Sequence, residues 1–144
     1  MKLDQIQNEW AVDSRIDKTE LGDESLKVPQ LHSKYFKIYC EEKTRYSHLQ
    51  HEYNRLYKVK YEYYAGTISE ESLTELGWEP QALKILRADI PMYINGDQDI
   101  VAQKQKIDLQ EVKLELLESI IKSLSNRGFQ IKTAVDWVKF TQGL

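Results

Sequence analysis

Residues 30–64 read QLHSKYFKIYCEEKTRYSHLQHEYNRLYKVKYEYY and contain neither glycine nor proline. Aromatic, apolar and a few polar side chains recur in this stretch at alternating spacings of three and four residues, the periodicity of a helix that packs along one face. Pro29 suits the first turn of a helix rather than its interior, and Gly66 suits the position after the last turn. We therefore expect one long helix between them, with this seam: His32, Tyr35, Tyr39, Glu42, Tyr46, Leu49, Tyr53, Leu56, Lys60 and Tyr63.

Short helices are predicted on both sides of this stretch. Residues 3–12 have apolar side chains at helical spacing, and a second short helix is expected to begin near Asp17. Residues 69–76 predict an acidic helix with Ser69 as its N-cap and Gly77 as its stop.

A second long helix is predicted over residues 98–125, after an irregular connection and a turn whose Asp97 is a helix N-cap. Residues 126–128, Asn-Arg-Gly, are expected to end it, and residues 130–140 to form a last short helix. Almost nothing is typical of a strand. The fold class is therefore all-α, with two long helices and several short helices in a single domain, residues 1–144.

An aliphatic stripe marks the later half of the second long helix. It is denser than one short neighbouring helix can cover, so we expect it to form a contact between subunits. The stripe consists of Leu114, Leu117, Ile121 and Leu124.

The composition is that of a water-soluble protein, with 41% hydrophobic and 30% charged residues. One cysteine, Cys40, excludes an intramolecular disulfide, which suits a reducing cytosol; we expect this thiol to be at least half-buried. No signal peptide or apolar run of membrane-spanning length is visible, so no membrane association is expected. The net charge of −3 hides a basic segment, residues 28–66, which has seven Lys and Arg against four Asp and Glu.

Catalytic and metal-binding chemistry has little support in the sequence. No glycine cluster could hold a phosphate, and His48 and His51 lack a clear third metal ligand beyond Glu52. We therefore expect no enzyme activity, no catalytic residue, no metal and no cofactor.

Residues 53–66, YNRLYKVKYEYYAG, combine five tyrosines with Arg55, Lys58 and Lys60. Cations interleaved with aromatic rings are typical of surfaces that bind single-stranded nucleic acid. On a helix, Lys60 shares a face with most of the tyrosines, whereas Arg55 and Lys58 point roughly opposite. Solvated charges on a packed helix would give the same pattern, so both interpretations stay open.

The arrangement Lys58-x-Lys60-x-x-Tyr63-Tyr64-x-Gly66 resembles a segment of the UvsY family of phage recombination mediators. Other pieces resemble the family in the same order along nearly the whole chain. They are Leu3–Trp10 with Ile16-Asp17, Leu31–Tyr35, Arg127-Gly128-Phe129, Ile131-Lys132, Phe140 and Gly143.

This resemblance implies an all-helical protomer in a ring-like or open-barrel homo-oligomer, hexameric or heptameric. It implies three further partners: single-stranded DNA, the phage recombinase and the phage single-strand binding protein. The family helps the recombinase to load onto DNA that the binding protein already covers, which places it in the cytoplasm of the infected bacterial host.

The same resemblance assigns DNA binding to Lys58 and Lys60. The best-known family member has arginine at the second position, and lysine lacks its planar, bidentate geometry. Arg55 is a further candidate contact, and Tyr57 and Tyr64 are candidates for stacking on bases.

Two other functions would fit the helical pattern. One is a structural coiled-coil adaptor or assembly protein without DNA binding, and the other is a replication accessory protein similar to a helicase loader. The clustering of aromatic and basic residues favours DNA contact, and the order of the matching segments favours the mediator.

Overall fold

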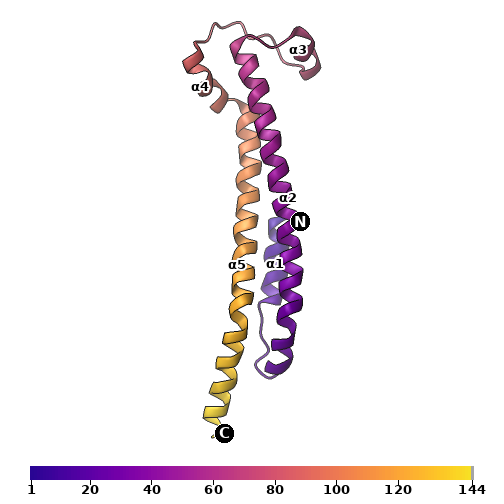
Figure 1. Cartoon of the computed structure of the whole chain (residues 1–144), viewed down its shortest axis with the longest axis vertical. Helices are drawn as coiled ribbons and strands as arrows, with labels where there is room; N and C mark the ends of the chain where they lie inside the picture. The colour runs from indigo at the N-terminus through magenta and orange to yellow at the C-terminus, as the bar shows by residue number, and fades with distance from the viewer. Residues whose placement is uncertain (144) are drawn as a thin grey trace. The chain divides into compact units, whose positions relative to one another are not determined.

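The structure, a computed structural model, describes residues 1–143 and is built from helices, with no strand among these residues (Figure 1). The all-α prediction is confirmed. The elements in chain order are α1 (Leu3–Asp13), α2 (Leu21–Ala65), α3 (Glu70–Leu76), the 3-10 helix η1 (Arg87–Asp89), α4 (Ile90–Asn95) and α5 (Gln98–Thr141). No helix of the described part is both long and apolar enough to cross a membrane.

The chain divides into two compact units, and a single domain therefore stays a prediction. The first unit contains residues 1–44 and those from 110 onward, and the second unit contains residues 45–109. Each unit includes about half of α2, whereas most of α5 belongs to the first unit and only its first turns, residues 98–109, belong to the second.

In the first unit, α1 lies alongside α2, and both contribute to a core with α5 (Figure 1). The fully buried members of this core are Ile6, Tyr35, Leu117, Ile120 and Leu124. Two polar contacts join the elements around it. The Gln110 amide donates to a carboxylate oxygen of Glu42 at 2.7 Å, and the Arg127 guanidinium donates to the backbone carbonyl of Asp13 at 3.0 Å.

Two predicted helix boundaries were wrong. Pro29 lies inside α2, which begins at Leu21. Leu21 and Ser25 lie beside the last part of α5, so the helix packs on both sides of the proline. Gly128 lies inside α5, whose core-facing spacing continues through the buried Arg127 to the buried Ile131. Packing therefore outweighs the local cost of each residue.

The stripe on α5 is not an uncovered surface, contrary to expectation. Leu114, Leu117 and Leu124 are buried inside the first unit, where Ile6 and Tyr35 cover the last two, and Ile121 is half-buried. Their role between subunits stays a prediction that this burial does not favour. Cys40, expected to be at least half-buried, is exposed.

The second unit has a smaller core, in which Ile90, Ile94 and Ile100 pack against tyrosines of α2. The predicted turns around it are confirmed. Gly66 ends α2 with a φ of 75°, and Gly77 ends α3 with a φ of 68°, both in the left-handed region that favours glycine. The segment after α2 therefore folds back and places α4 against α2.

Candidate nucleic-acid interface

The last turns of α2 carry the residues that the sequence singled out, and they lie wholly in the second unit. Arg55 and Lys58 are exposed, and neither has an ion-pair partner among residues 1–143. They are three residues apart, so they share one flank of the helix. Their charges are therefore available to a phosphate backbone, as expected for an interface with nucleic acid.

Lys60 lies differently from this pair, because its side chain is buried at 5% exposure. Its ammonium nitrogen lies 3.0 Å from a carboxylate oxygen of Asp97 and 2.9 Å from one of Asp99. The same nitrogen lies 3.9 Å from the centre of the Trp78 ring, a cation–π contact. Lys60 is therefore not an exposed cation in this structure, and its predicted contact with DNA stays a prediction that this burial does not favour.

Asp97 joins the Lys60 contacts to the start of α5. One carboxylate oxygen accepts from the backbone N–H groups of Asp99 and Ile100, which confirms the predicted N-cap. The other accepts from the Tyr64 hydroxyl at 2.6 Å. Burial acts to raise the pKa of Asp97, but the hydrogen bonds from Tyr64 and Lys60 outweigh it and hold this pKa below its usual value. Burial and the neighbouring carboxylate raise the pKa of Tyr64.

We call Lys60, Tyr64, Trp78, Asp97 and Asp99 the Lys60 cluster. It contains one cation and two carboxylates, so a DNA phosphate that approached Lys60 would also meet the negative charge of Asp97 and Asp99. The cluster instead ties α2, the connection after α3 and the start of α5 together.

The two adjacent tyrosines of the motif also have structural partners. The Tyr63 hydroxyl donates to the backbone carbonyl of Glu79 at 2.7 Å, and the Tyr63 ring meets Trp78 edge-on. The Tyr64 backbone carbonyl accepts from the Gln81 amide at 3.1 Å. Tyr63, Tyr64, Lys60 and Gly66 all stabilise the point where the chain folds back after α2. Most of the motif therefore has a structural role, and Lys58 is the motif residue whose charge is exposed.

Tyr57 and Tyr64, the candidates for base stacking, are half-buried and pack on the isoleucine core of the second unit. Their packing accounts for their presence, and their stacking on bases stays a prediction.

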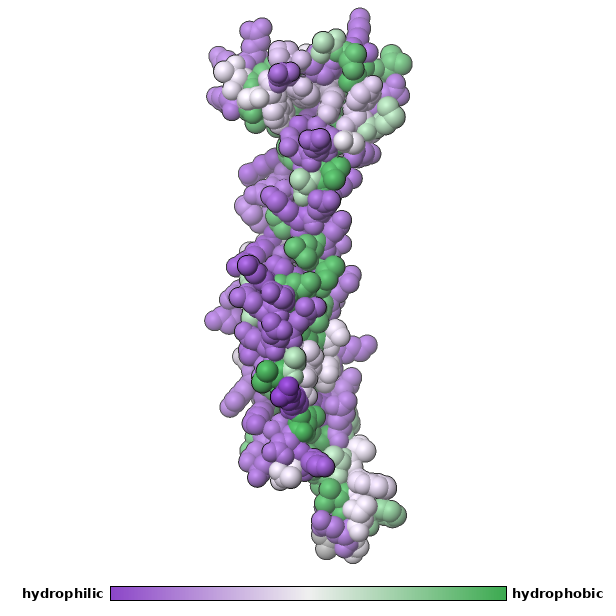
Figure 2. Space-filling view, turned by 180° about the vertical axis from the view of Figure 1, so that it is seen from behind, coloured by the Kyte–Doolittle hydropathy of each residue, from purple (hydrophilic) through white to green (hydrophobic). Residues whose placement is uncertain are grey.

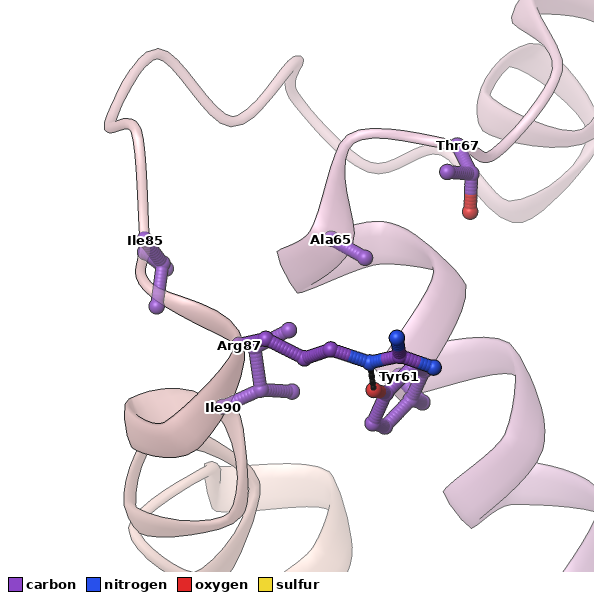
Figure 3. Close-up of a pocket in the computed structure, with 6 residues that line it drawn as sticks. All are labelled: Tyr61, Ala65, Thr67, Ile85, Arg87 and Ile90. Atoms are coloured by element: carbon purple, nitrogen blue, oxygen red, sulfur yellow. Dashed lines mark hydrogen bonds between the residues drawn. The ribbon is translucent and has the colours of Figure 1, made fainter.

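A pocket of about 300 Å³ opens beside the end of α2 (Figure 3). Tyr61, Ala65 and Thr67 line one side, and Ile85, Arg87 and Ile90 line the other. The Arg87 side chain extends from η1 across the pocket, and its Nε donates to the Tyr61 hydroxyl at 3.3 Å (Figure 3).

Arg87, Trp78 and Asp99 were not singled out from the sequence. Each comes from a segment that is distant in the chain from the motif, and no local spacing links them to it. The sequence contains one signal for such contacts: residues 53–66 have three cations and only one acidic residue, so a carboxylate partner for Lys60 had to come from a distant segment. No group of acidic, histidine or cysteine side chains that could hold a metal occurs within the described residues.

Comparison with known proteins agrees with this fold. Residues 9–144 match the family model for UvsY, described as a recombination, repair and ssDNA binding protein. The recombination protein uvsY of Enterobacteria phage T4 is 22% identical over 143 residues, covering 99% of both chains.

Two crystal structures of the bacteriophage T4 recombination mediator protein UvsY have the same fold. Lattice type II gives a TM-score of 0.86 at 20% identity, covering 99% of this chain and 98% of that chain. Lattice type IV gives 0.85 at 21% identity, covering 97% and 99%. The family model, which spans nearly the whole sequence, makes this chain a member of the UvsY family.

Proposed function

We propose that this chain is a recombination mediator. It binds single-stranded DNA and promotes loading of a phage recombinase onto strands that a single-strand binding protein covers. Membership of a family described by recombination, repair and single-stranded DNA binding carries this proposal. The unpaired, exposed cations Arg55 and Lys58 support it, because they lie in the motif segment and are free to meet phosphates.

The residues of the motif have different roles in this proposal. Lys58 and Arg55 contact the phosphate backbone directly. Lys60 contributes as a positioning residue, since its ammonium is held by Asp97 and Asp99. Tyr57 and Tyr64 stabilise the same fold-back and stack on bases only if the strand reaches their half-exposed edges.

Assembly multiplies a weak site. In a hexameric or heptameric homo-oligomer, one strand engages several copies of the cation pair, and the avidity far exceeds the affinity of one protomer. The mediator acts without nucleotide hydrolysis, so its effect must come from a higher affinity for the strand shape or protein complex that favours the recombinase. The host cytoplasm is the compartment where these partners meet.

The direct test follows ATP hydrolysis by the cognate recombinase on single strands coated with the cognate single-strand binding protein. Wild-type protein should shorten the lag before filament growth, and Lys58→Ala should shorten it less. Lys106→Ala, which removes an exposed charge from α5 in the same unit, is the matched control. If wild-type protein shortens no lag at any protein ratio or salt concentration, the structural adaptor becomes the better interpretation.

A further inference from the structure

The pocket between Tyr61 and Arg87 has the chemistry of a nucleotide site. Its lining contains an aromatic ring, aliphatic side chains, two hydroxyls and one guanidinium, and none of its six residues is acidic (Figure 3). A nucleotide unit offers complementary groups, since its base has an apolar face that stacks on rings and its phosphate attracts cations.

The charge of Arg87 is not neutralised. Within residues 1–143 it has no carboxylate partner, and its Nε donates a hydrogen bond to the Tyr61 hydroxyl. This bond uses Nε, so the terminal N–H groups of the guanidinium are left to bind an oxyanion. The contrast with Lys60 is direct, because that cation is held by two carboxylates.

Lys58 extends the pocket along α2. Lys58, Tyr61 and Ala65 follow one another at spacings of three and four residues, so they lie along one flank of the helix. A strand that crosses this flank meets Lys58 first and the mouth of the pocket about one turn later. Its path is therefore bordered by Lys58 on one side and Arg87 on the other.

The size of the pocket limits what it can hold. Its volume of about 300 Å³ is at the lower end of the range for small-molecule sites, roughly 300–1,000 Å³. The buried Ile90 and the half-buried Ile85 form apolar walls. One base fits this space, whereas a folded partner segment needs a longer groove.

We propose that this pocket binds one base of the single strand, with the base against Tyr61 and the two isoleucines and the flanking phosphates on Arg87 and Lys58. This inference rests on the proposed DNA binding and names the residues that carry it. An aromatic platform and unpaired cations are tolerant of base identity, so little sequence preference is expected.

Two strands of equal length and charge test the role of the base: a thymidine homopolymer and a strand of abasic sites. Wild-type protein should bind the homopolymer more tightly, by roughly 5- to 100-fold for a stacked base. Tyr61→Leu, which keeps an apolar side chain but removes the ring, should reduce this preference. Arg87→Gln should flatten the dependence of log affinity on log salt by roughly 0.7 for one lost phosphate contact, and Lys106→Ala should not.

Photocrosslinking gives a readout that does not depend on the stability of a variant. A strand with 5-iododeoxyuridine should form an adduct at Tyr61 of the wild-type protein, located by fragment mass spectrometry. Adducts confined to other residues would overturn the assignment. It would also be overturned if Tyr61→Leu preferred the homopolymer over the abasic strand as strongly as wild type does and Arg87→Gln left the salt slope unchanged.

The proposed function and the pocket assignment fail in distinguishable ways. Wild-type protein that binds neither strand removes both. If wild-type protein binds both strands equally tightly and Arg87→Gln changes neither affinity, the pocket assignment alone is wrong. If Arg87→Gln binds DNA as tightly as wild type but no longer binds a synthetic acidic peptide that wild type binds, the pocket is a protein site and the assignment to DNA is wrong.

Discussion

Lys58 and Lys60 are two residues apart on α2, but their ammonium groups have opposite surroundings. Lys58 is exposed with no ion-pair partner in the described chain, whereas Lys60 is held by Asp97 and Asp99. We expect Lys58→Ala to flatten the salt dependence of single-stranded DNA binding by roughly 0.7, because one phosphate contact is lost. Its thermal midpoint should stay close to wild type, since an exposed charge contributes little to stability. Fluorescence anisotropy across salt concentrations and a melting curve measure both.

Lys60→Met is the contrasting variant. It keeps the length of the side chain but leaves Asp97 buried without its cation, which costs about 3 kcal/mol of unfolding free energy. Its DNA affinity should fall only indirectly, through loosening of the segment that folds back after α2, because in our proposal Lys60 does not contact phosphate itself. A variant of wild-type stability with a flatter salt slope would instead show that Lys60 contacts phosphate directly.

Asp97 also makes stability depend on pH. Its pKa is lowered in the folded chain, so its contribution is complete above the unfolded value of about 3.9 and is lost as the pH falls through the folded value. Asp97→Asn lacks this titration. The stability gap between wild type and Asp97→Asn should therefore be largest near neutral pH, begin to narrow at about pH 5 and go on narrowing as the pH falls through the lowered folded pKa. Urea unfolding at several pH values measures it, and a gap that stays constant would contradict the role of the carboxylate.

The sequence predicted the cap but not the ion pair of Asp97. A turn before a helix is a local signal, so Asn95-Gly96-Asp97 could be identified from its neighbours alone. The contact with Lys60 joins residues far apart in the chain and depends on how the connection folds back. Helix geometry already places Lys58 and Lys60 on different sides of the helix, but only the tertiary fold shows that Lys60 is paired with carboxylates and Lys58 is not.

At the scale of elements, local rules located most helix ends but placed the start of α2 too late and the end of α5 too early. The helix ends predicted at Gly66 and Gly77 are confirmed, because the backbone there is left-handed and excludes most other residues. Pro29 and Gly128 were read as boundaries, although neither forbids a helix that packing stabilises on both sides. The aliphatic spacing on either side of Gly128 continues without a change of face, and this was the evidence for one continuous helix.

Gly128→Ala should stabilise α5. A Cβ atom at this position meets nothing within 4 Å, and the helical backbone suits alanine, so we expect a gain of roughly 0.5–1 kcal/mol. Gly66→Ala is the matched control, because its φ of 75° makes the same added methyl group unfavourable. Chemical denaturation of both variants measures the two free energies. Equal effects would show that Gly128 has a further role, such as close packing in an assembly.

At the scale of the whole molecule, the proposed homo-oligomer needs an apolar surface that the protomer does not cover itself. The leucines of the α5 stripe do not supply one, since Leu117 and Leu124 are fully buried. The carboxyl-terminal turns of α5 do, because Phe129 and Phe140 are about three-quarters exposed, at 74% and 76%. Figure 2 shows hydrophobic atoms at this end of the helix.

We expect a second copy of the chain to cover this surface in the proposed homo-oligomer, because Trp137 and Phe140 stack on each other while both stay exposed. We expect Phe129→Ser with Phe140→Ser to give smaller assemblies of folded protein, measured by light scattering and circular dichroism. Single-stranded DNA affinity should fall with assembly size, because fewer cation pairs engage one strand. Leu117→Asp is the contrasting variant and should unfold the first unit instead, since it places a charge in a closed core. Full-size assemblies of the double serine variant at micromolar concentration would show that subunits meet elsewhere on the protomer.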